Sequence, residues 1–245
     1  MAIVDVTLGA FVMLAATAAG SSIVLLFRCM SNKMRAALLA FSGGVMGYTA
    51  IEMLVQSHQN AGDATLLAGL ALGILALFAI DRFLPHIHAH FRKSDMAAAK
   101  KKTYLLAGTI MLHNIPEGFA VASAFAGSLG LGWLVTASIA LQDIPEGLLV
   151  AMPLACYGMS TRKSFFYGIF SGVVEFAAAI IGFLLLSMLL FAIPFALAFS
   201  SGAMIYVVLV ELLPDAFEKG FERMGALCFV LGAAAAFAMA ALFAA

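Results

Sequence analysis

The chain has 245 residues, of which 64% are hydrophobic and 11% charged, with a mean hydropathy of +1.08 and a formal net charge of zero. Soluble proteins are usually about 45–50% apolar and about 25% charged, and a single soluble core of this size cannot bury such an apolar excess. The composition therefore indicates an integral membrane protein. It excludes a nucleic-acid-binding protein, a secreted disulfide scaffold and a disordered chain.

Apolar runs of membrane-spanning length follow one another along the whole chain. A helix needs roughly 20 apolar residues to cross the hydrocarbon core of a bilayer. The first run has no basic leader and is long enough to be a span rather than a cleaved signal peptide. We expect one all-α transmembrane domain over residues 1–245, with one long loop at 85–102. The predicted helices are 5–27, 35–56, 64–84, 103–125, 129–157, 164–192, 195–217 and 224–243.

The basic residues lie only in alternate connections between the predicted helices. All 13 Lys and Arg residues fall in the first, third, fifth and seventh connections or, for Arg35 and Arg82, at the helix ends beside them. None falls in the other connections or at the ends of the chain. Lys and Arg accumulate on the cytoplasmic side of membrane proteins. The pattern therefore predicts a multi-pass protein with both termini outside and the 85–102 loop in the cytoplasm.

Three cysteines, Cys29, Cys156 and Cys228, lie far apart in the chain. The count is odd and no CxxC pair occurs, which argues against a disulfide framework or a structural zinc site. The sequence predicts that they serve as small apolar packing residues.

One six-residue pattern occurs twice, 29 residues apart. Residues 113–118 read HNIPEG, and residues 142–147 read QDIPEG. The first and fifth positions of each copy are four residues apart, so they share one face of a helix. The proline removes a backbone donor, and backbone groups freed in a bilayer are tolerated where they line a site or cavity. The repeat predicts two polar helix faces that meet within the membrane.

Ionisable residues within membrane spans are candidates for function. With a helical rise of about 1.5 Å per residue, both motifs and Glu175 of the sixth predicted helix fall near the midplane. Two divalent cations would neutralise the four carboxylates there, whereas the alternative is a packed network of protonated, hydrogen-bonded carboxylates. Imidazole, amide and carboxylate ligands suit Zn²⁺, with Fe²⁺, Mn²⁺ and Cd²⁺ also open. The candidate ligands are His113, Asn114, Glu117, Gln142, Asp143, Glu146 and Glu175.

These motifs resemble those of the ZIP family (Zrt/Irt-like proteins) of divalent-metal transporters, and the Gln-Asp start of the second copy is most similar to the bacterial GufA-type branch. The resemblance implies eight helices in a 3+2+3 inverted-repeat arrangement. It also implies metal uptake through the inner membrane of a bacterium, by an elevator-like movement of helices 1, 4, 5 and 6 against the rest.

The resemblance further implies a binuclear metal site at the midplane, in which Glu117 and Glu146 serve both metals. The other ligands of the first metal would be His113 and Gln142, with Met46 of the second helix as an additional thioether ligand. The other ligands of the second metal would be Asn114, Asp143 and Glu175. Packing is the alternative role for Met46.

Further polar residues outline a route across the membrane. Glu52 lies toward the outer face and Glu211 toward the inner face, with solvation near a helix end as the alternative for each. Many relatives have His-Glu where this chain has Val210-Glu211, which casts doubt on an imidazole at the inner exit. A cytoplasmic metal-binding loop, with a merely solvated loop as the alternative, would use His86, His88 and His90.

The leading function is transport of zinc or a related divalent ion as substrate, with no organic cofactor, no nucleic-acid partner and no enzymatic activity. Glycine-rich faces permit a homodimer in the lipid bilayer. One alternative is an intramembrane di-metal enzyme, although the chain has no HExxH motif and only one histidine at the centre. The other is a proton-coupled transporter of a small organic substrate, although the acids are arranged more like a ligand set than a relay.

Overall fold

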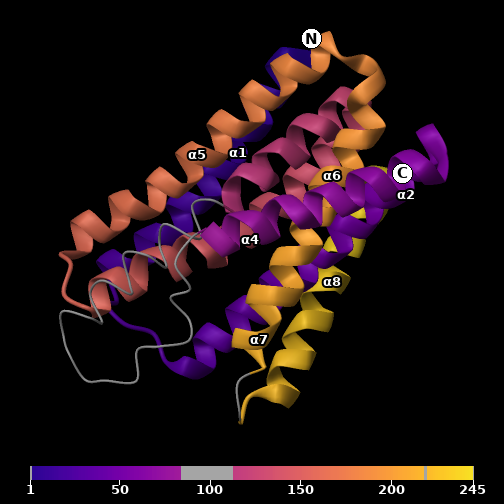
Figure 1. Cartoon of the computed structure of the whole chain (residues 1–245). Coiled ribbons are helices and arrows are strands. Elements are labelled where there is room, and N and C mark those ends of the chain that lie inside the picture. The colour runs from indigo at the N-terminus through magenta and orange to yellow at the C-terminus, as the bar shows by residue number, and fades with distance from the viewer. Residues whose placement is uncertain (1, 84–112, 218–219, 245) are drawn as a thin grey trace.

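A computed structural model describes residues 2–83, 113–217 and 220–244, and every regular element in these ranges is helical (Figure 1). Residues 113–127 form one helix that has no label in Figure 1. The labelled helices are α1 (Ala2–Ser22), α2 (Asn32–Phe83), α4 (Leu129–Cys156), α5 (Thr161–Met188), α6 (Ile193–Val207), α7 (Leu213–Ala216) and α8 (Glu222–Ala244). The short 3₁₀ turns η1 (Ile23–Leu25) and η2 (Leu190–Ala192) and the π-helical turn η3 (Val208–Leu212) complete the set.

The described residues confirm the expectation of a helical membrane protein. Six helices within them are long and apolar enough to cross a bilayer, by length and composition. They are Ile3–Leu25, Asn32–Arg82, Leu129–Cys156, Thr161–Met188, Leu190–Ala216 and Glu222–Phe243. The predicted helix 103–125 begins outside the described residues, as does the loop that carries His86, His88 and His90. The total of eight spans stays a prediction.

The long helix α2 consists of two arms that turn back on each other at Gly62. Gly62 has φ 76° and ψ −175°, a backbone conformation that is open essentially only to glycine. Before this break, the Ser57 hydroxyl donates to the Pro194 carbonyl (2.7 Å) at the start of α6. After it, Gly69 packs against Phe195 of the same region. The two predicted helices 35–56 and 64–84 correspond to these two arms.

The helices form two bundles, which we define by their contacts. The first bundle comprises α1, the 113–127 helix, α4 and α5, because α1, α4 and α5 all pack against one another and Gly118 packs against α5. The second bundle comprises α2, α6, η3, α7 and α8, since α2 packs along each of the others. In Figure 1 the purple ribbon of α2 lies across α6, α7 and α8, while α1 and α5 lie together away from them. The bundles meet where α4 contacts α2 and α8, and where the 113–127 helix contacts α6 through Phe119 and Phe199.

Glycines let backbones touch within the first bundle. A Cβ at Gly20 would overlap the carbonyl oxygen of Ile144, and one at Gly147 would overlap that of Thr17, so α1 and α4 are in backbone contact. Gly118 meets the carbonyl oxygen of Glu175 in the same way. Small residues allow this close approach, which stabilises helix pairs in lipid.

The second bundle is joined by the same kind of contact. Gly44 and Gly73 have no room for a Cβ because they face the carbonyl oxygens of Phe229 and Phe199. Gly202 likewise faces the carbonyl of Leu70. The helices of the second bundle are therefore also in backbone contact.

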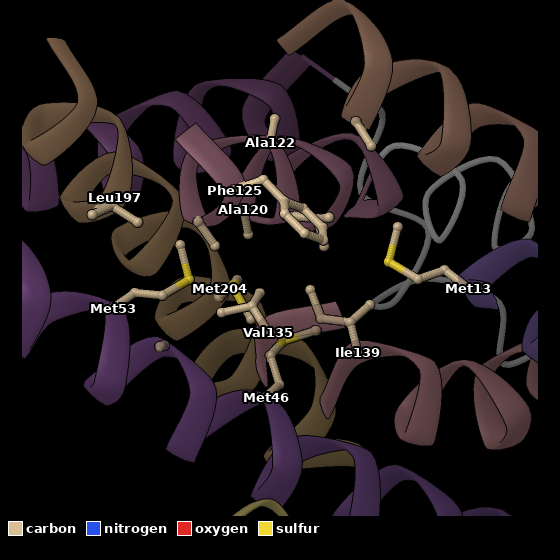
Figure 2. Close-up of a cluster of buried hydrophobic side chains, with 14 of the residues drawn as sticks. Met13, Met46, Met53, Ala120, Ala122, Phe125, Val135, Ile139, Leu197 and Met204 are labelled. Carbon is tan, nitrogen blue, oxygen red and sulfur yellow. The ribbon is translucent and has the colours of Figure 1, made fainter. Parts of the chain in front are cut away.

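Side chains, rather than backbones, fill the space between the bundles. Figure 2 shows this cluster of buried apolar side chains, in which Met46, Met53 and Met204 of the second bundle lie near Val135 and Ile139 of α4. All five are fully buried or nearly so. Methionine is flexible and adapts to irregular surfaces. The contact between the bundles can therefore adjust more easily than the backbone contacts inside each bundle.

The prediction for two of the three cysteines is wrong. Cys29 and Cys156 form a disulfide, with their Cα atoms 5.0 Å apart. Because 127 residues separate them in the sequence, no local spacing rule could find the pair. The contact arises when α4 ends beside the segment that connects α1 to α2. Cys228 is a free, partly exposed thiol on α8.

Candidate metal centre

The two copies of the motif lie at the centre of the first bundle. In each copy the glycine explains the placement of the preceding glutamate. Gly118 seats the 113–127 helix on the α5 backbone at Glu175, and Gly147 seats α4 on α1 at Thr17. A larger residue at either position would push the neighbouring glutamate away from the bundle centre. The repeated Pro-Glu-Gly triplet thus combines a weakened backbone, an acid and a close helix contact.

Three carboxylates from the two motif copies form one cluster. Glu117, Asp143 and Glu146 each have an oxygen within 4.8 Å of the others. Glu117 and Asp143 are buried, and Glu146 is partly buried. Glu175 of α5 is fully buried and close enough to interact electrostatically with Asp143, Glu117 and Glu146. We call these four residues the carboxylate cluster.

The two amides are positioned by hydrogen bonds. The Gln142 side-chain nitrogen donates to Glu117 Oε1 (2.8 Å), which links α4 to the 113–127 helix. The Asn114 side-chain nitrogen donates to the backbone carbonyl of Ser171 on α5 (3.0 Å). Both amides therefore turn their nitrogens toward protein acceptors and leave their oxygens free to coordinate.

Several buried oxygens of the centre have no hydrogen-bond partner among the residues that the structure describes. They are Asn114 Oδ1, Glu117 Oε2, Gln142 Oε1, Asp143 Oδ2 and both Oε atoms of Glu175. A buried polar atom without a partner costs about 1–3 kcal/mol, and more when it is charged. Removing an ion from water costs several kcal/mol after the protein relaxes. A divalent cation bound at this centre would satisfy several of these oxygens together.

His113 belongs to a second group of potential ligands. Its Nε2 lies 2.9 Å from Glu211 Oε1 in the π-helical turn η3. Asp81, at the end of α2, completes a set of three ligand atoms within 4.8 Å of one another. The Tyr206 hydroxyl donates to Asp81 Oδ2 (2.9 Å) and holds that carboxylate in place. We call Asp81, His113 and Glu211 the second triad.

Asp81 is the residue of this region that the sequence analysis missed. An acid within the predicted span 64–84 was a visible signal. Asp81 lies next to Arg82, close to the end of α2. The pairing of His113 with Glu211 links the two bundles, whereas the helical spacing of four residues had suggested that His113 joins Glu117.

The structure does not bring all the predicted residues together. Met46 is buried in the apolar cluster of Figure 2, close to Val135 and Ile139. Glu52 is partly buried in the first arm of α2. The loop histidines His86, His88 and His90 lie outside the described residues.

Comparisons with known proteins agree with the geometry. The profile of the family described as ZIP Zinc transporter matches residues 92–240. Zinc transporter GufA of Myxococcus xanthus is 38% identical over 175 residues, covering 69% of each chain. Zinc transporter ZupT of Chlorobium phaeovibrioides is 35% identical over 239 residues, covering 89% of this chain and 90% of its own. Zinc transporter ZIPB of Bordetella bronchiseptica is 33% identical over 230 residues, covering 89% and 74% respectively.

Proposed function

Since the chain belongs to the ZIP family of zinc transporters, we propose that it moves zinc through the inner membrane of a bacterium into the cytoplasm. The family consists of transporters, which argues against the alternative of an intramembrane enzyme. Oxygen-rich sites accept several divalent ions, so iron, manganese and cadmium are further candidate substrates. The observation that carries the proposal is the carboxylate cluster with its unpartnered buried oxygens.

The centre offers ligands for two ions. One ion would use Glu117, Gln142 and Glu146, and a neighbouring ion would use Asn114, Asp143 and Glu175 together with the two shared glutamates. His113 is the exception, because it faces Glu211 in this structure. We propose that the His113 side chain moves between the first ion and Glu211. In doing so it would transfer zinc from the carboxylate cluster to the second triad.

The surroundings of the centre suggest a route. In α4, the buried apolar residues Val135 and Ile139 precede Gln142, toward the end of the helix that the charge pattern assigns to the outside. This apolar layer would close the centre to the outside. The second triad would form the inner exit, and Glu52 would lie on the outer approach. Zinc bound at the centre would then leave toward the cytoplasm.

The proposed topology has eight spans in a 3+2+3 inverted repeat, with both termini outside. The two arms of α2 support it, because each arm is long enough to cross a bilayer and they run in opposite directions past α6. The 113–127 helix would contribute the outer part of the fourth predicted span. The glycine-rich helix faces also allow a homodimer.

An elevator movement would carry the first bundle against the second. Its support is the difference in packing described above. Inside each bundle, glycines bring backbone against backbone. Between the bundles, Gly127 makes the nearest glycine approach recorded among the described residues, and a Cβ there would lie 3.7 Å from Ile193 and 3.9 Å from Leu197, in ordinary contact. Two rigid bodies with a methionine-rich contact can slide without breaking their own cores.

Zinc influx into proteoliposomes that contain a zinc-sensitive dye tests the proposal. The wild-type protein is expected to transport zinc, and Glu146→Gln is expected to lose transport because it removes a carboxylate from both ions. The matched control is Glu222→Gln at the exposed start of α8, which should transport like wild type. Full influx in Glu146→Gln, with both variants eluting as intact protein, would refute the mechanism.

A further inference from the structure

The disulfide connects the end of a helix in the first bundle to the segment that precedes the second bundle. Cys156 is the last residue of α4, in the first bundle. Cys29 lies in the segment between η1 and Ser31, whose side chain accepts a hydrogen bond from Met34 N (3.1 Å) in the first turn of α2. Two residues, Met30 and Ser31, separate Cys29 from Asn32, the first residue of α2. The bond therefore ties the end of α4 to the beginning of α2.

The bond shortens the tether between the bundles. With the bond, the tether from Cys156 consists of the 5.0 Å between the two cysteine Cα atoms and three residue steps from Cys29 to Asn32. Those three steps add at most about 10–11 Å when fully extended. Without the bond, the covalent route from the first bundle to α2 runs from Leu25 to Asn32, over seven steps and about 23–25 Å. The bond thus reduces the freedom of the first bundle to move relative to α2.

The position of the bond suits a reversible reaction. Cys29 and Cys156 are both exposed, so that small thiols and disulfides can reach them. Cys29 lies in the first connection, and Cys156 lies at the end of α4, next to the fifth connection. These connections carry Arg28 and Lys163, and the charge pattern assigns them to the cytoplasm. Cytosolic thiols keep most cysteines reduced, and the disulfides that do form there are usually transient or redox-sensing. A purely structural disulfide would be unusual on this side.

We propose that Cys29 and Cys156 are a redox-modified pair that restrains zinc transport when they are oxidised and releases it when they are reduced. This inference rests on the proposed function, because it assumes the cytoplasmic location and the relative movement of the two bundles. It adds a covalent control point that is remote from the metal ligands.

The chemistry is thiol–disulfide exchange with a small cellular disulfide, RSSR. One cysteine thiolate attacks RSSR, forms a mixed disulfide and releases one RS⁻. The second cysteine thiolate then attacks the protein sulfur of the mixed disulfide and displaces the second RS⁻. The two cysteine protons end on the two released thiols, so two protein thiols are oxidised as one RSSR is reduced to two RSH. Two RSH molecules reverse the reaction.

Zinc influx with protein of defined redox state tests the proposal. The purified protein is oxidised with oxidised glutathione or reduced with a phosphine, freed of reagent, and reconstituted with a zinc-sensitive dye inside the vesicles. Mass spectrometry after alkylation establishes the state of each cysteine. Reduced wild type is expected to transport at least about fivefold faster than oxidised wild type, the lower end of ordinary coupling between distant sites.

Two variants provide the controls. The double variant Cys29→Ser/Cys156→Ser should transport like reduced wild type in both treatments. Cys228→Ser, which removes the free thiol of α8, should remain as redox-sensitive as wild type. Equal influx of oxidised and reduced wild type, or failure of the pair to oxidise, would overturn the inference while leaving the proposed function intact. Absence of influx in every sample would refute the proposed function itself.

Discussion

His113 and Glu117 lie one turn apart on the same helix, yet they take part in different clusters. Glu117 joins Asp143 and Glu146, whereas His113 lies against Glu211 of the other bundle. Helical spacing places two side chains on one face, but the direction of each side chain depends on what the neighbouring helix presents. The acids and amides of the motifs could thus be predicted as a group, while the partner of His113 could not.

The contact between His113 and Glu211 leads to a prediction about the inner exit. We expect Glu211→Gln to slow zinc influx by roughly tenfold, because contacts to a charged group are worth about 1.5–3 kcal/mol and the amide attracts a cation less. Dye-based influx measures this effect, and equilibrium dialysis should show that the carboxylate cluster still binds zinc.

Asp215→Asn is the matched control for Glu211→Gln. Asp215 is an acid four residues after Glu211. Its Oδ2 lies 3.4 Å from Nη1 of Arg35, in a partly exposed ion pair. Exposed pairs contribute only about 0–1 kcal/mol, so this variant should transport nearly as well as wild type. Equal influx in Glu211→Gln and Asp215→Asn would remove Glu211 from the route.

At the scale of the elements, the apolar runs predicted helix positions better than helix shape. The two arms of α2 turn at Gly62. The single helix α2 therefore covers both of the predicted helices 35–56 and 64–84. Glu211 lies in the π-helical turn η3, which ends at Leu212, two residues before Pro214. A proline clashes with the carbonyl four residues earlier, and the wider π turn relieves this crowding. Such turns recur at functional sites.

The close contact of the motif glycine predicts a stability change. In Gly118→Ala the added Cβ would overlap the carbonyl oxygen of Glu175, so we expect a loss of roughly 1–3 kcal/mol, as for other overpacked positions. A lower melting temperature in detergent is the measurement. Gly130→Ala is the control, because nothing lies within 4 Å of a Cβ there.

The control should have unchanged or slightly higher stability, since alanine in a helix is favoured over glycine by roughly 0.5–1 kcal/mol. If both variants melted at the wild-type temperature, the backbone contact between the 113–127 helix and α5 would be looser than described. The account of how Glu175 reaches the centre would then need revision.

For the whole molecule, the essential feature is that two bundles with glycine-joined interiors meet through an apolar, methionine-rich layer. A carrier has to rearrange somewhere, and rearrangement is easiest where flexible side chains meet. The same division explains why the disulfide from α4 to the start of α2 matters. It joins the parts whose relative position would change.

The elevator proposal predicts that cross-links within and between bundles differ in effect. In a background without native cysteines, Gly43→Cys/Leu212→Cys would join two parts of the second bundle, where the Cβ atoms would lie 3.6 Å apart. Gly127→Cys/Ile193→Cys would join the two bundles. Oxidation should abolish zinc influx only in the second pair.

Reduction of the cross-link should restore influx in Gly127→Cys/Ile193→Cys and should change nothing in the within-bundle pair. Mass spectrometry is needed to establish that both bonds form. Undiminished influx with the bundles joined at residues 127 and 193 would contradict an elevator, and would favour a route that opens by local side-chain movement.

The sequence by itself determined the membrane class, the approximate helices and the acids of the centre, because hydropathy and helical spacing act over a few turns of one chain segment. The Pro-Glu-Gly repeats and Glu175 were visible for the same reason. Only the tertiary structure decided the pairing of Cys29 with Cys156, the inclusion of Asp81 and the partner of His113. These depend on which helix backbones approach each other across tens or hundreds of residues, and no local pattern in the sequence identifies the partner helix.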